Sequence, residues 1–338
     1  MMKKKLIAAL SVILAFAMLF CTACGGNDNP APEAEGGDAA QAGTIAKIKT
    51  GTGSTTGTYY AFTTAVAQIL KTDAYSFEVL STGGSQANIE GIEDGDYQFA
   101  IVQNDVMNYA FKGTNGFEAP ITDFSAVGCV YPEVCQLIAT EASGIKSVSD
   151  LKGKTVAVGD VGSGVYYNAT QILAAAGLDI DADIKKVAAS FGDSATQLKD
   201  GSIDAAFITA GTPTTAITEL ATSTKVVAVD LGDEVIAKLK AEYPFYAEYT
   251  MTDKDYDFVK DPVKTVAIMA TFIVTNDMSE DQVYEITKKL WESKEDIKNN
   301  WAVDKVFTPT MTDARKEELV KGWHKAVKCS IYMAQEDE

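Results

Sequence analysis

The feature that most constrains the fold of this chain is an internal repeat. Residues 45–70 read IAKIKTGTGSTTGTYYAFTTAVAQIL, and residues 154–178 read KTVAVGDVGSGVYYNATQILAAAGL. Each copy has a short apolar run, a loop rich in Gly, Ser and Thr, a Tyr-Tyr pair and an amphipathic helical pattern. Gly57 and Gly164 stand at the same place in the two loops, 107 positions apart. A chain built from such a repeat is expected to fold as two similar units.

The repeat continues beyond these segments. GGSQANIEGIEDGDYQFAIVQ at 83–103 corresponds to FGDSATQLKDGSIDAAFITA at 191–210. Both stretches predict a loop, a short helix, an Asp-Gly turn and a buried strand. The alternation of strands and helices predicts a β-α-β-α-β unit with parallel strands in each copy.

Two long apolar segments, 126–140 and 264–276, flank the second copy. Each is long enough to be a strand that passes from one unit to the other. We therefore predict an α/β protein with the two-lobed type II periplasmic-binding-protein fold, in which each lobe is a mostly parallel sheet flanked by helices and two hinge crossings join the lobes. The expected boundaries are 44–132 plus 265–338 for lobe 1 and 133–264 for lobe 2, with helices of lobe 1 at 281–301 and 313–327.

The first 43 residues have the pattern of an exported and anchored protein. MMKKK precedes an uncharged apolar run, which predicts a signal peptide over 1–23. The sequence Thr-Ala-Cys-Gly-Gly around Cys24 resembles a bacterial lipobox, with Cys21 in place of the usual Leu, and predicts lipidation of Cys24. An ordinary cleaved signal is the alternative. Residues 24–43 have no aromatic or β-branched side chain and are predicted to be a disordered tether, so the protein is expected outside the cytoplasmic membrane, at the cell surface or in the periplasm.

The composition narrows the classes of function. A formal net charge of −18 disfavours nucleic acid and anionic lipid as partners. A single histidine, His324, argues against most His-dependent hydrolases and zinc enzymes, and no spacing of Cys or His predicts a metal site. Neither enzymatic activity nor a cofactor is expected. Buried free thiols are expected at Cys129, Cys135 and Cys329.

Other classes of protein use a loop such as GTGSTTGTYY. In a nucleotide-binding enzyme it would hold a phosphate, but the spacing of Gly51, Gly53 and Gly57 departs from G-x-G-x-x-G, and no P-loop lysine follows. In a structural or adhesive lipoprotein the duplicated loops would have no purpose. A binding protein is therefore the favoured class.

The loops after the first strand of each copy are the predicted ligand site. In open α/β sheets, ligands bind at the carboxyl ends of the strands, where helix N-termini present N–H groups and partial positive charge. Loops 51–58 and 159–164 would offer N–H groups and hydroxyls, including that of Thr58, to an anion in a chain whose one arginine is Arg315. Asp105 could accept a ligand ammonium or cap the helix that follows it, and one ring of each tyrosine pair could face the site. The candidate ligand-binding residues are Thr52, Gly53, Ser54, Thr56, Tyr59, Tyr60, Ser85, Asn88, Gln103, Asp105, Tyr131, Gly162, Ser163, Gly164, Tyr167, Gly211 and Thr212.

Three stretches together resemble one family of receptors. GTGSTTGTYY at 51–60, STGGSQANIEGIEDGDYQFAIVQNDV at 81–106 and VAVGDVGSGVYYNATQIL at 156–173 are similar to motifs of the TAXI-type solute receptors of TRAP (tripartite ATP-independent periplasmic) transporters. The resemblance covers about 44–330. It departs near the end, where His324-Lys-Ala-Val stands in place of the His-Pro-Gly-Ala-like segment common in the family.

This resemblance implies a receptor for a small carboxylate or amino acid, such as glutamate or glutamine. The receptor would deliver its anionic or zwitterionic solute to a membrane-embedded TRAP permease driven by an ion gradient, without ATP. A monomer is expected. The substrate-binding lipoprotein of an ABC importer would share the fold, the anchor and the binding site, and is the alternative.

Overall fold

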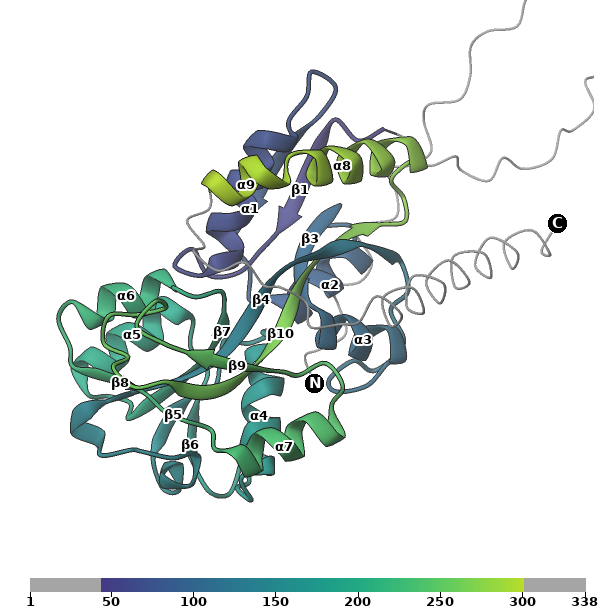
Figure 1. Cartoon of the computed structure of the whole chain (residues 1–338). Helices are drawn as coiled ribbons and strands as arrows, with labels where there is room; N and C mark the ends of the chain where they lie inside the picture. The colour runs from purple at the N-terminus through teal and green to yellow at the C-terminus, as the bar shows by residue number, and fades with distance from the viewer. Residues whose placement is uncertain (1–43, 301–338) are drawn as a thin grey trace, which may run out of the picture. The chain divides into compact units, whose positions relative to one another are not determined.

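The computed structural model describes residues 44–300 of the chain, with side chains described through 297 (Figure 1). The predicted signal peptide and tether, the helix expected at 313–327, and Arg315, His324 and Cys329 lie outside the described residues. Within the described part, no helix is long and apolar enough to cross a membrane.

The first copy of the repeat forms the β-α-β-α-β unit that the sequence predicts. Strand β1 lies between β2 and β3 and pairs in parallel with both. Helix α3 follows directly on β3. The elements of this lobe are β1 (Lys47–Gly51), α1 (Thr58–Leu70), β2 (Ser76–Leu80), α2 (Ser85–Glu93), β3 (Phe99–Gln103) and α3 (Asn104–Lys112).

The second copy builds the second lobe with the same connectivity. Strand β5 pairs in parallel with β6 and with β7, which confirms the predicted parallel arrangement. Helices α1 and α4 begin at Thr58 and Val165, so the helix starts keep the 107-residue spacing of the sequence repeat. The elements here are β5 (Thr155–Ala157), α4 (Val165–Ala175), β6 (Lys185–Val187), α5 (Phe191–Asp200), β7 (Ala205–Ala210), α6 (Thr215–Ala221), β8 (Val226–Ala228), α7 (Asp233–Glu242) and β9 (Ala247–Met251). Two short 3-10 helices, Glu141–Ser143 and Val148–Leu151, precede them.

Two long antiparallel strands, β4 (Phe124–Thr140) and β10 (Val263–Thr275), connect the lobes. β10 pairs with β3 of the first lobe, and β4 continues past β10 to pair with β7 of the second. In the described residues all strands therefore join one mixed sheet, whose main order is β2-β1-β3-β10-β4-β7-β5-β6. The two crossings that the apolar segments predicted are present, and the lobe boundaries at 132 and 265 stay a prediction.

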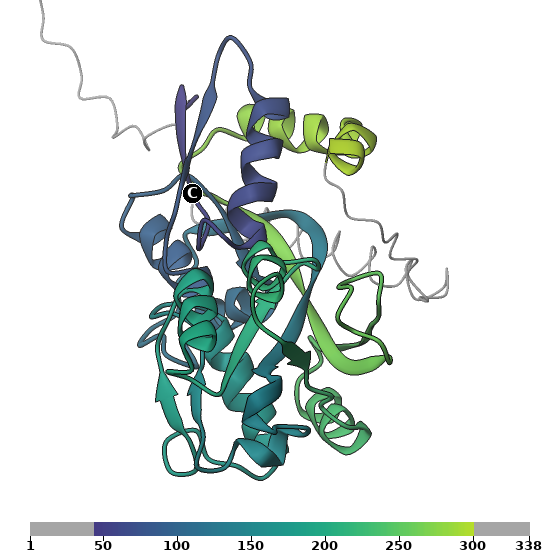
Figure 2. The same cartoon turned by 90° about the vertical axis from the view of Figure 1, so that its left-hand side faces the viewer.

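The chain returns to the first lobe after β10. The helix predicted over 281–301 is two helices, α8 (Glu280–Glu292) and α9 (Lys294–Asn300), because α8 ends at Ser293. Both lie beside α1 in the two views (Figures 1 and 2).

Each lobe has its own apolar core. In the first lobe, Phe99 and Phe272 pack with ring centroids 4.9 Å apart and are almost fully buried. In the second, Leu137, Leu151 and Ile172 are completely buried. Because strands β4 and β10 contribute side chains to both cores, the position of the sheet fixes where the loops of the two lobes meet.

Candidate functional site

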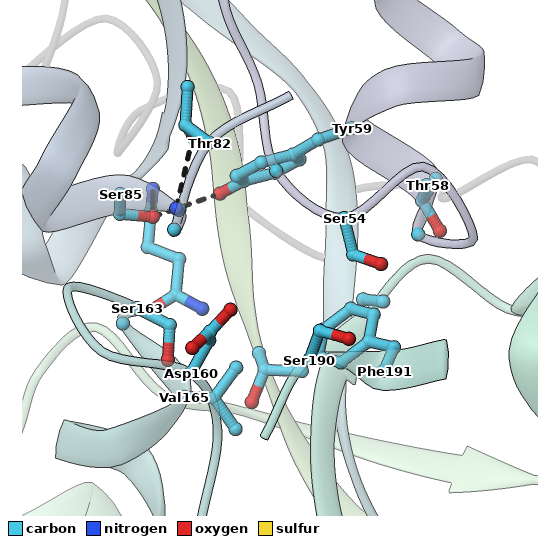
Figure 3. Close-up of a pocket in the computed structure, with 18 of the residues that line it drawn as sticks. Ser54, Thr58, Tyr59, Thr82, Ser85, Asp160, Ser163, Val165, Ser190 and Phe191 are labelled. Atoms are coloured by element: carbon cyan, nitrogen blue, oxygen red, sulfur yellow. Dashed lines mark hydrogen bonds between the residues drawn. The ribbon is translucent and has the colours of Figure 1, made fainter. Parts of the chain in front are cut away.

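A pocket of about 500 Å³, part of which is open to solvent, lies between the loops of the two lobes (Figure 3). In Figure 3 the labelled side chains of the first lobe enter from above and those of the second lobe from below. The lining residues are Gly53, Ser54, Gly57, Thr58, Tyr59, Thr82, Gly83, Gly84, Ser85, Gln103, Glu133, Asp160, Ser163, Gly164, Val165, Ser190, Phe191, Thr209 and Ala210.

Five of the described helices begin at this pocket, three from the first lobe and two from the second. The N-cap residues of α1, α2, α3, α4 and α5 are Gly57, Gly84, Gln103, Gly164 and Ser190, and all five line the pocket. The helices start here because each follows the carboxyl end of a parallel strand, and those ends face one another across the sheet. The first N–H groups of a helix have no partner within the helix and carry partial positive charge, so they favour an anionic group.

The charged groups among the lining residues are two carboxyl groups, and no Lys, Arg or His lies among them. Glu133 is on strand β4 and is 1% exposed. The hydroxyl of Tyr59 donates to Glu133 Oε2 over 2.7 Å, and it lies 3.3 Å from Ser85 Oγ. Burial raises the pKa of Glu133 well above its usual value, against the effect of the Tyr59 hydrogen bond. The second carboxyl group, that of Asp160, is half-buried and accepts from the N–H of Val161 over 2.8 Å.

Two further polar atoms at the pocket are buried without a hydrogen-bond partner in the described structure. They are Gln103 Oε1 and Ser163 Oγ, on side chains that are 2% and 7% exposed. Buried polar groups in folded proteins are nearly always paired, and an unpaired group in a pocket is typical of a ligand site. One group from each lobe is thus placed for a bound molecule.

The two lobes are in contact beside the pocket. The carbonyl oxygen of Gly162 accepts from the N–H groups of Gln86 (3.0 Å) and Ala87 (3.1 Å) at the start of α2. At a second place, Thr58 Oγ1 donates to the carbonyl oxygen of Gly211 over 3.1 Å. These contacts hold the lobes closed over the pocket.

A buried polar network joins α3 of the first lobe to the second lobe. Asn168 Nδ2 donates to Asp105 Oδ2 (3.0 Å) and to the hydroxyl oxygen of Tyr246 (3.1 Å). Gln171 donates to the hydroxyl oxygen of Tyr109 over 2.8 Å and accepts from the Tyr246 hydroxyl over 2.6 Å. Burial raises the pKa of Asp105 to about 7, against its hydrogen bonds from Val106 N and Asn168. We call these five residues (Asp105, Tyr109, Asn168, Gln171 and Tyr246) the interlobe network.

The structure brings part of the predicted site together and places the rest elsewhere. Contact of the pocket residues with a ligand stays a prediction. The predicted residues that line the pocket are Gly53, Ser54, Tyr59, Ser85, Gln103, Ser163 and Gly164. The predicted residues outside the lining are Thr52, Thr56, Tyr60, Asn88, Asp105, Tyr131, Gly162, Tyr167, Gly211 and Thr212.

Several of the residues outside the lining have contacts within the protein. Asn88 Nδ2 donates to the carbonyl oxygens of Thr52 (2.7 Å) and Ile101 (2.8 Å), so it fixes the loop after β1 to the sheet. Asp105 lies in the first turn of α3 and belongs to the interlobe network; the N-cap of that helix is Gln103, so the capping alternative for Asp105 is wrong.

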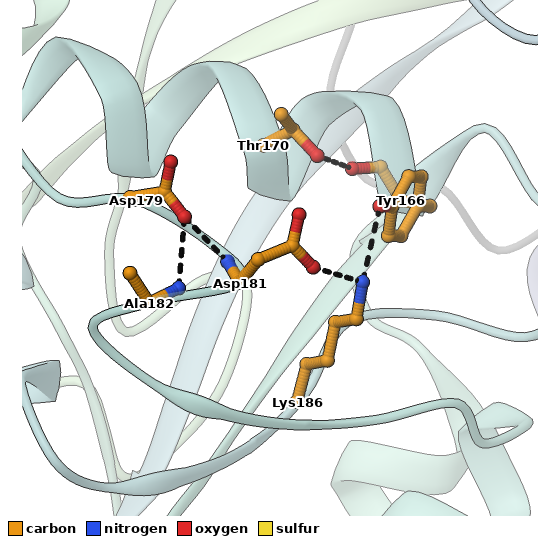
Figure 4. Close-up of polar contacts among 6 residues, drawn as sticks. All are labelled: Tyr166, Thr170, Asp179, Asp181, Ala182 and Lys186. Atoms are coloured by element: carbon orange, nitrogen blue, oxygen red, sulfur yellow. Dashed lines mark hydrogen bonds and ion pairs between the residues drawn. The ribbon is translucent and has the colours of Figure 1, made fainter.

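The two Tyr-Tyr pairs differ in where their side chains lie. Tyr59 lines the pocket, and its neighbour Tyr60 does not. Tyr167 donates to Gln86 Oε1 over 2.6 Å, across the contact between the lobes. Tyr166 faces the outer surface of the second lobe, where Lys186 lies over its ring at 5.5 Å from the centroid and pairs with Asp181 (Figure 4). The second pair therefore serves the interlobe contact and the surface.

Nine lining residues lie outside both the predicted loops and the candidate residues: Thr82, Gly83, Gly84, Glu133, Val165, Ser190, Phe191, Thr209 and Ala210. Asp160 lies in the predicted loop 159–164 but was not a candidate residue. Ser190 was detectable, because it precedes α5 as Gly84 precedes α2 in the aligned repeat. Glu133 belongs to no local motif; its signal was a lone carboxyl group within the long apolar crossing segment. Cys135 is a buried free thiol as expected, whereas Cys129 is free but exposed.

Two lobes of this topology, two crossing strands and a pocket between the lobes define the fold of the periplasmic binding proteins. The chain matches the NMT1-like family over residues 50–322 and belongs to that family. A protein of Bordetella bronchiseptica RB50 has a similar structure, with a TM-score of 0.50, 15% identity and coverage of 75% of both chains. The alkanesulfonate-binding protein SsuA from Xanthomonas axonopodis pv. citri, bound to MOPS, has a TM-score of 0.49 and 14% identity over 77% of this chain and 76% of that one.

Short segments also match curated enzymes. A segment of 41 residues is 51% identical to glycerol kinase 1 of Clostridium tetani, and one of 47 residues is 47% identical to the glycerol kinase of Agathobacter rectalis. These matches cover 12% and 14% of this chain but only 8% and 9% of the two enzymes. The chain thus spans less than a tenth of these relatives, and the matches describe a short shared segment rather than a shared enzyme.

Proposed function

We propose that the protein is an extracytoplasmic solute-binding receptor that captures a small carboxylate or amino acid, similar to glutamate or glutamine, for uptake. The observation that carries the proposal is the convergence of five helix N-termini, three from the first lobe and two from the second, on one pocket. A solute held by both lobes would favour the closed arrangement, since a ligand shifts a conformational equilibrium toward the state that it binds better.

The pocket offers an anionic group a binding mode without a formal positive charge. The lining has no basic side chain, and its donors are helix N–H groups and the hydroxyls of Ser54 and Ser163. The hydroxyls of Thr58, Thr82 and Ser190 donate to acceptors within the protein. A helix N-terminus stabilises a negative group by about 0.3–1 kcal/mol when exposed and up to about 2 kcal/mol when partly buried. The N–H groups of Gln86 and Ala87 in α2 are bound to the Gly162 carbonyl oxygen, and α5 is capped by Ser190. The ends of α1 and α4 therefore give the main support for binding of a carboxylate.

We further propose that the receptor serves a TRAP permease driven by an ion gradient, with an ABC importer as the alternative. The proposal rests on the motifs of the repeat. Uptake of the solute into membrane vesicles would distinguish the two. A TRAP partner requires an ion gradient and no ATP, whereas uptake that depends on ATP hydrolysis would favour the ABC alternative.

Anchoring through a lipid on Cys24 completes the proposal. In a Cys24→Ser variant, the protein should leave the membrane fraction and lose incorporation of labelled fatty acid. Retention of the label in this variant would contradict lipidation at Cys24.

A thermal-shift panel tests the receptor function directly. Full-length protein is heated with individual amino acids, mono- and dicarboxylates and sulfonates. A ligand at 100 times its dissociation constant should stabilise the folded state by about 2.7 kcal/mol, which raises the melting temperature measurably. Absence of any shift at millimolar concentrations would contradict the proposed class of solute.

A further inference from the structure

The carboxyl group of Glu133 has no evident structural purpose. It lies on the crossing strand β4, is 1% exposed, and faces a pocket rather than a basic residue. Every ion pair recorded among the described residues lies elsewhere. A buried carboxylate without a cation is unfavourable, and proteins retain such a group mainly where it has a function.

The recorded hydrogen bond to this carboxyl group involves one of its two oxygens. Among the described residues, the Tyr59 hydroxyl donates to Glu133 Oε2. The other oxygen, Oε1, belongs to a side chain that lines the pocket. If Glu133 served only to position Tyr59, a neutral amide would do so without the cost of burying an ionisable group.

The surroundings of Glu133 complement a molecule with two charges. Helix N-termini from both lobes favour a negative group, while Glu133, with Asp160 on the second lobe, favours a positive one. The unpartnered Gln103 Oε1 is a further acceptor at the pocket. A simple dicarboxylate has no amine to donate hydrogen bonds to these acceptors.

We infer that Glu133 accepts a protonated amine of the bound solute, so that the pocket selects a zwitterion over a carboxylate of the same shape. This inference rests on the proposed receptor function and narrows its class of solute. It assigns the ammonium-binding role to Glu133 and not to Asp105, which lies outside the pocket lining and is hydrogen-bonded to Asn168.

Binding of an amine should then release a proton. Burial, and more weakly the charge of Asp105, hold the pKa of Glu133 above its usual value in the empty pocket, which favours the protonated form of this group. The other titratable groups that face it are the phenols of Tyr59 and Tyr131 and the thiol of Cys135, each with a raised pKa, so none supplies a positive charge. An ammonium favours the ionised carboxylate and lowers its pKa. Affinity for an amine should therefore rise with pH until the empty receptor has itself lost the proton.

The test is calorimetric titration of the full-length protein with L-glutamate, L-glutamine and glutarate, which is glutamate without its amine. Each titration is run in phosphate and in Tris, whose different ionisation enthalpies reveal protons released on binding. We expect an amino acid to bind with proton release and with affinity that rises from pH 5 to pH 8, and glutarate to bind roughly 30-fold or more weakly.

The matched variants are Glu133→Gln, which resembles the protonated group, and Glu234→Gln, which removes an exposed carboxylate on α7. Glu133→Gln should lose roughly 30-fold or more in affinity for the amino acid and release no proton, whereas Glu234→Gln should behave as the wild type. The pH dependence of the unaltered protein tests the inference even if the Glu133 variant folds poorly.

The outcomes separate the inference from the receptor function. Equal affinity for glutamate and glutarate, or binding without proton release, would overturn the role of Glu133 and leave the receptor intact. Binding of none of the three compounds would overturn the glutamate-like class of solute, and this inference with it.

Discussion

The two copies of the repeat share a backbone plan but differ in the side chains at equivalent positions. Gly57 and Gly164 precede the first helix of each lobe, 107 residues apart. At the same spacing, Gly53 of the first lobe corresponds to Asp160 of the second, and both line the pocket. The repeat therefore places helix N-termini of both lobes at the pocket. The carboxyl group of Asp160, by contrast, comes from the second lobe and has no counterpart in the loop of the first.

The second helix of each copy shows the same asymmetry. Helix α5 is capped within its own lobe, since Ser190 Oγ accepts from the N–H of Asp193 over 3.2 Å. Helix α2 has Gly84 at that place, and its N–H groups at Gln86 and Ala87 bind the Gly162 carbonyl oxygen of the other lobe. An N-terminal N–H group of α5 therefore has its hydrogen-bond partner within its own lobe, whereas two of those of α2 have theirs in the other lobe.

The largest effect is expected from a change that keeps the lobes apart. A Cβ atom on Gly83 would lie 2.3 Å from the carbonyl oxygen of Val161, and both positions are fixed by the backbone. Gly83→Ala should therefore weaken binding by about tenfold or more, because closure would have to overcome this overlap. Calorimetry gives the affinity, and small-angle scattering should show a larger radius of gyration.

Gly128→Ala, on β4 outside the pocket lining, is the matched control for this change. Its Cβ would meet Trp291 at 3.7 Å, an ordinary van der Waals contact. If Gly83→Ala bound ligand as well as Gly128→Ala does, the contact between Gly83 and Val161 would not be part of the bound state.

The interlobe network should make stability depend on pH. The native state keeps the proton of Asp105 up to about pH 7, whereas the unfolded chain loses it near 3.8. The native state thus binds more protons between these values, so this group lowers stability as pH rises from about 4 to 7. Asp105→Asn should reduce the change of unfolding free energy with pH, measured by urea unfolding at several pH values. The pH dependence that remains should come from Glu133, whose pKa is also raised.

Asp150 provides a control of opposite sign. Hydrogen bonds from the N–H of Lys146 and from Ser147 lower the pKa of its exposed carboxyl group. Its contribution to stability is present above the unfolded pKa and is lost as pH falls. Asp150→Asn should therefore lower the unfolding free energy of the protein at neutral pH, and this loss should become smaller as the pH falls. If both variants changed the pH dependence of stability in the same direction, the opposite roles given to Asp105 and Asp150 would be wrong.

Substitutions of two serine N-caps distinguish an effect on stability from an effect on ligand binding. Ser190 and Ser279 both accept from a backbone N–H at the start of a helix, but only Ser190 lines the pocket. Replacement of either by alanine should cost about 1 kcal/mol of unfolding free energy in chemical denaturation. Only Ser190→Ala should also weaken ligand binding, and equal affinities would remove Ser190 from the site.

The smallest effects are expected at the second tyrosine pair. Tyr167→Phe removes a 2.6 Å hydrogen bond to Gln86 between the lobes and should cost about 0.5–1.5 kcal/mol, with weaker binding. Tyr166→Phe removes a 3.5 Å contact with Lys186 at the surface and should change stability by less than about 0.5 kcal/mol. Melting temperatures and affinities of both variants check this, and a larger loss for Tyr166→Phe would reverse the assignment.

Much of the fold could be predicted from the sequence, because strands, loops and helices repeat in a fixed order. The helix starts, the parallel units and the two crossing strands follow from local apolar periodicity and turn residues. For the candidate site, the sequence predicted which loops form it but not which of their side chains line the pocket. Whether Tyr59 or Tyr60 faces the pocket depends on the rotation of α1 against the sheet, which packing decides.

The sequence by itself determined that two similar units place helix N-termini at one interface, since a repeated pattern gives a repeated backbone. Only the tertiary structure decided which side chains share that interface. Glu133 meets Tyr59, 74 residues away, because strand β4 crosses beneath the loops of both lobes. A residue on such a strand belongs to no loop motif, and its chemistry depends on burial, which arises only when the lobes are folded and closed.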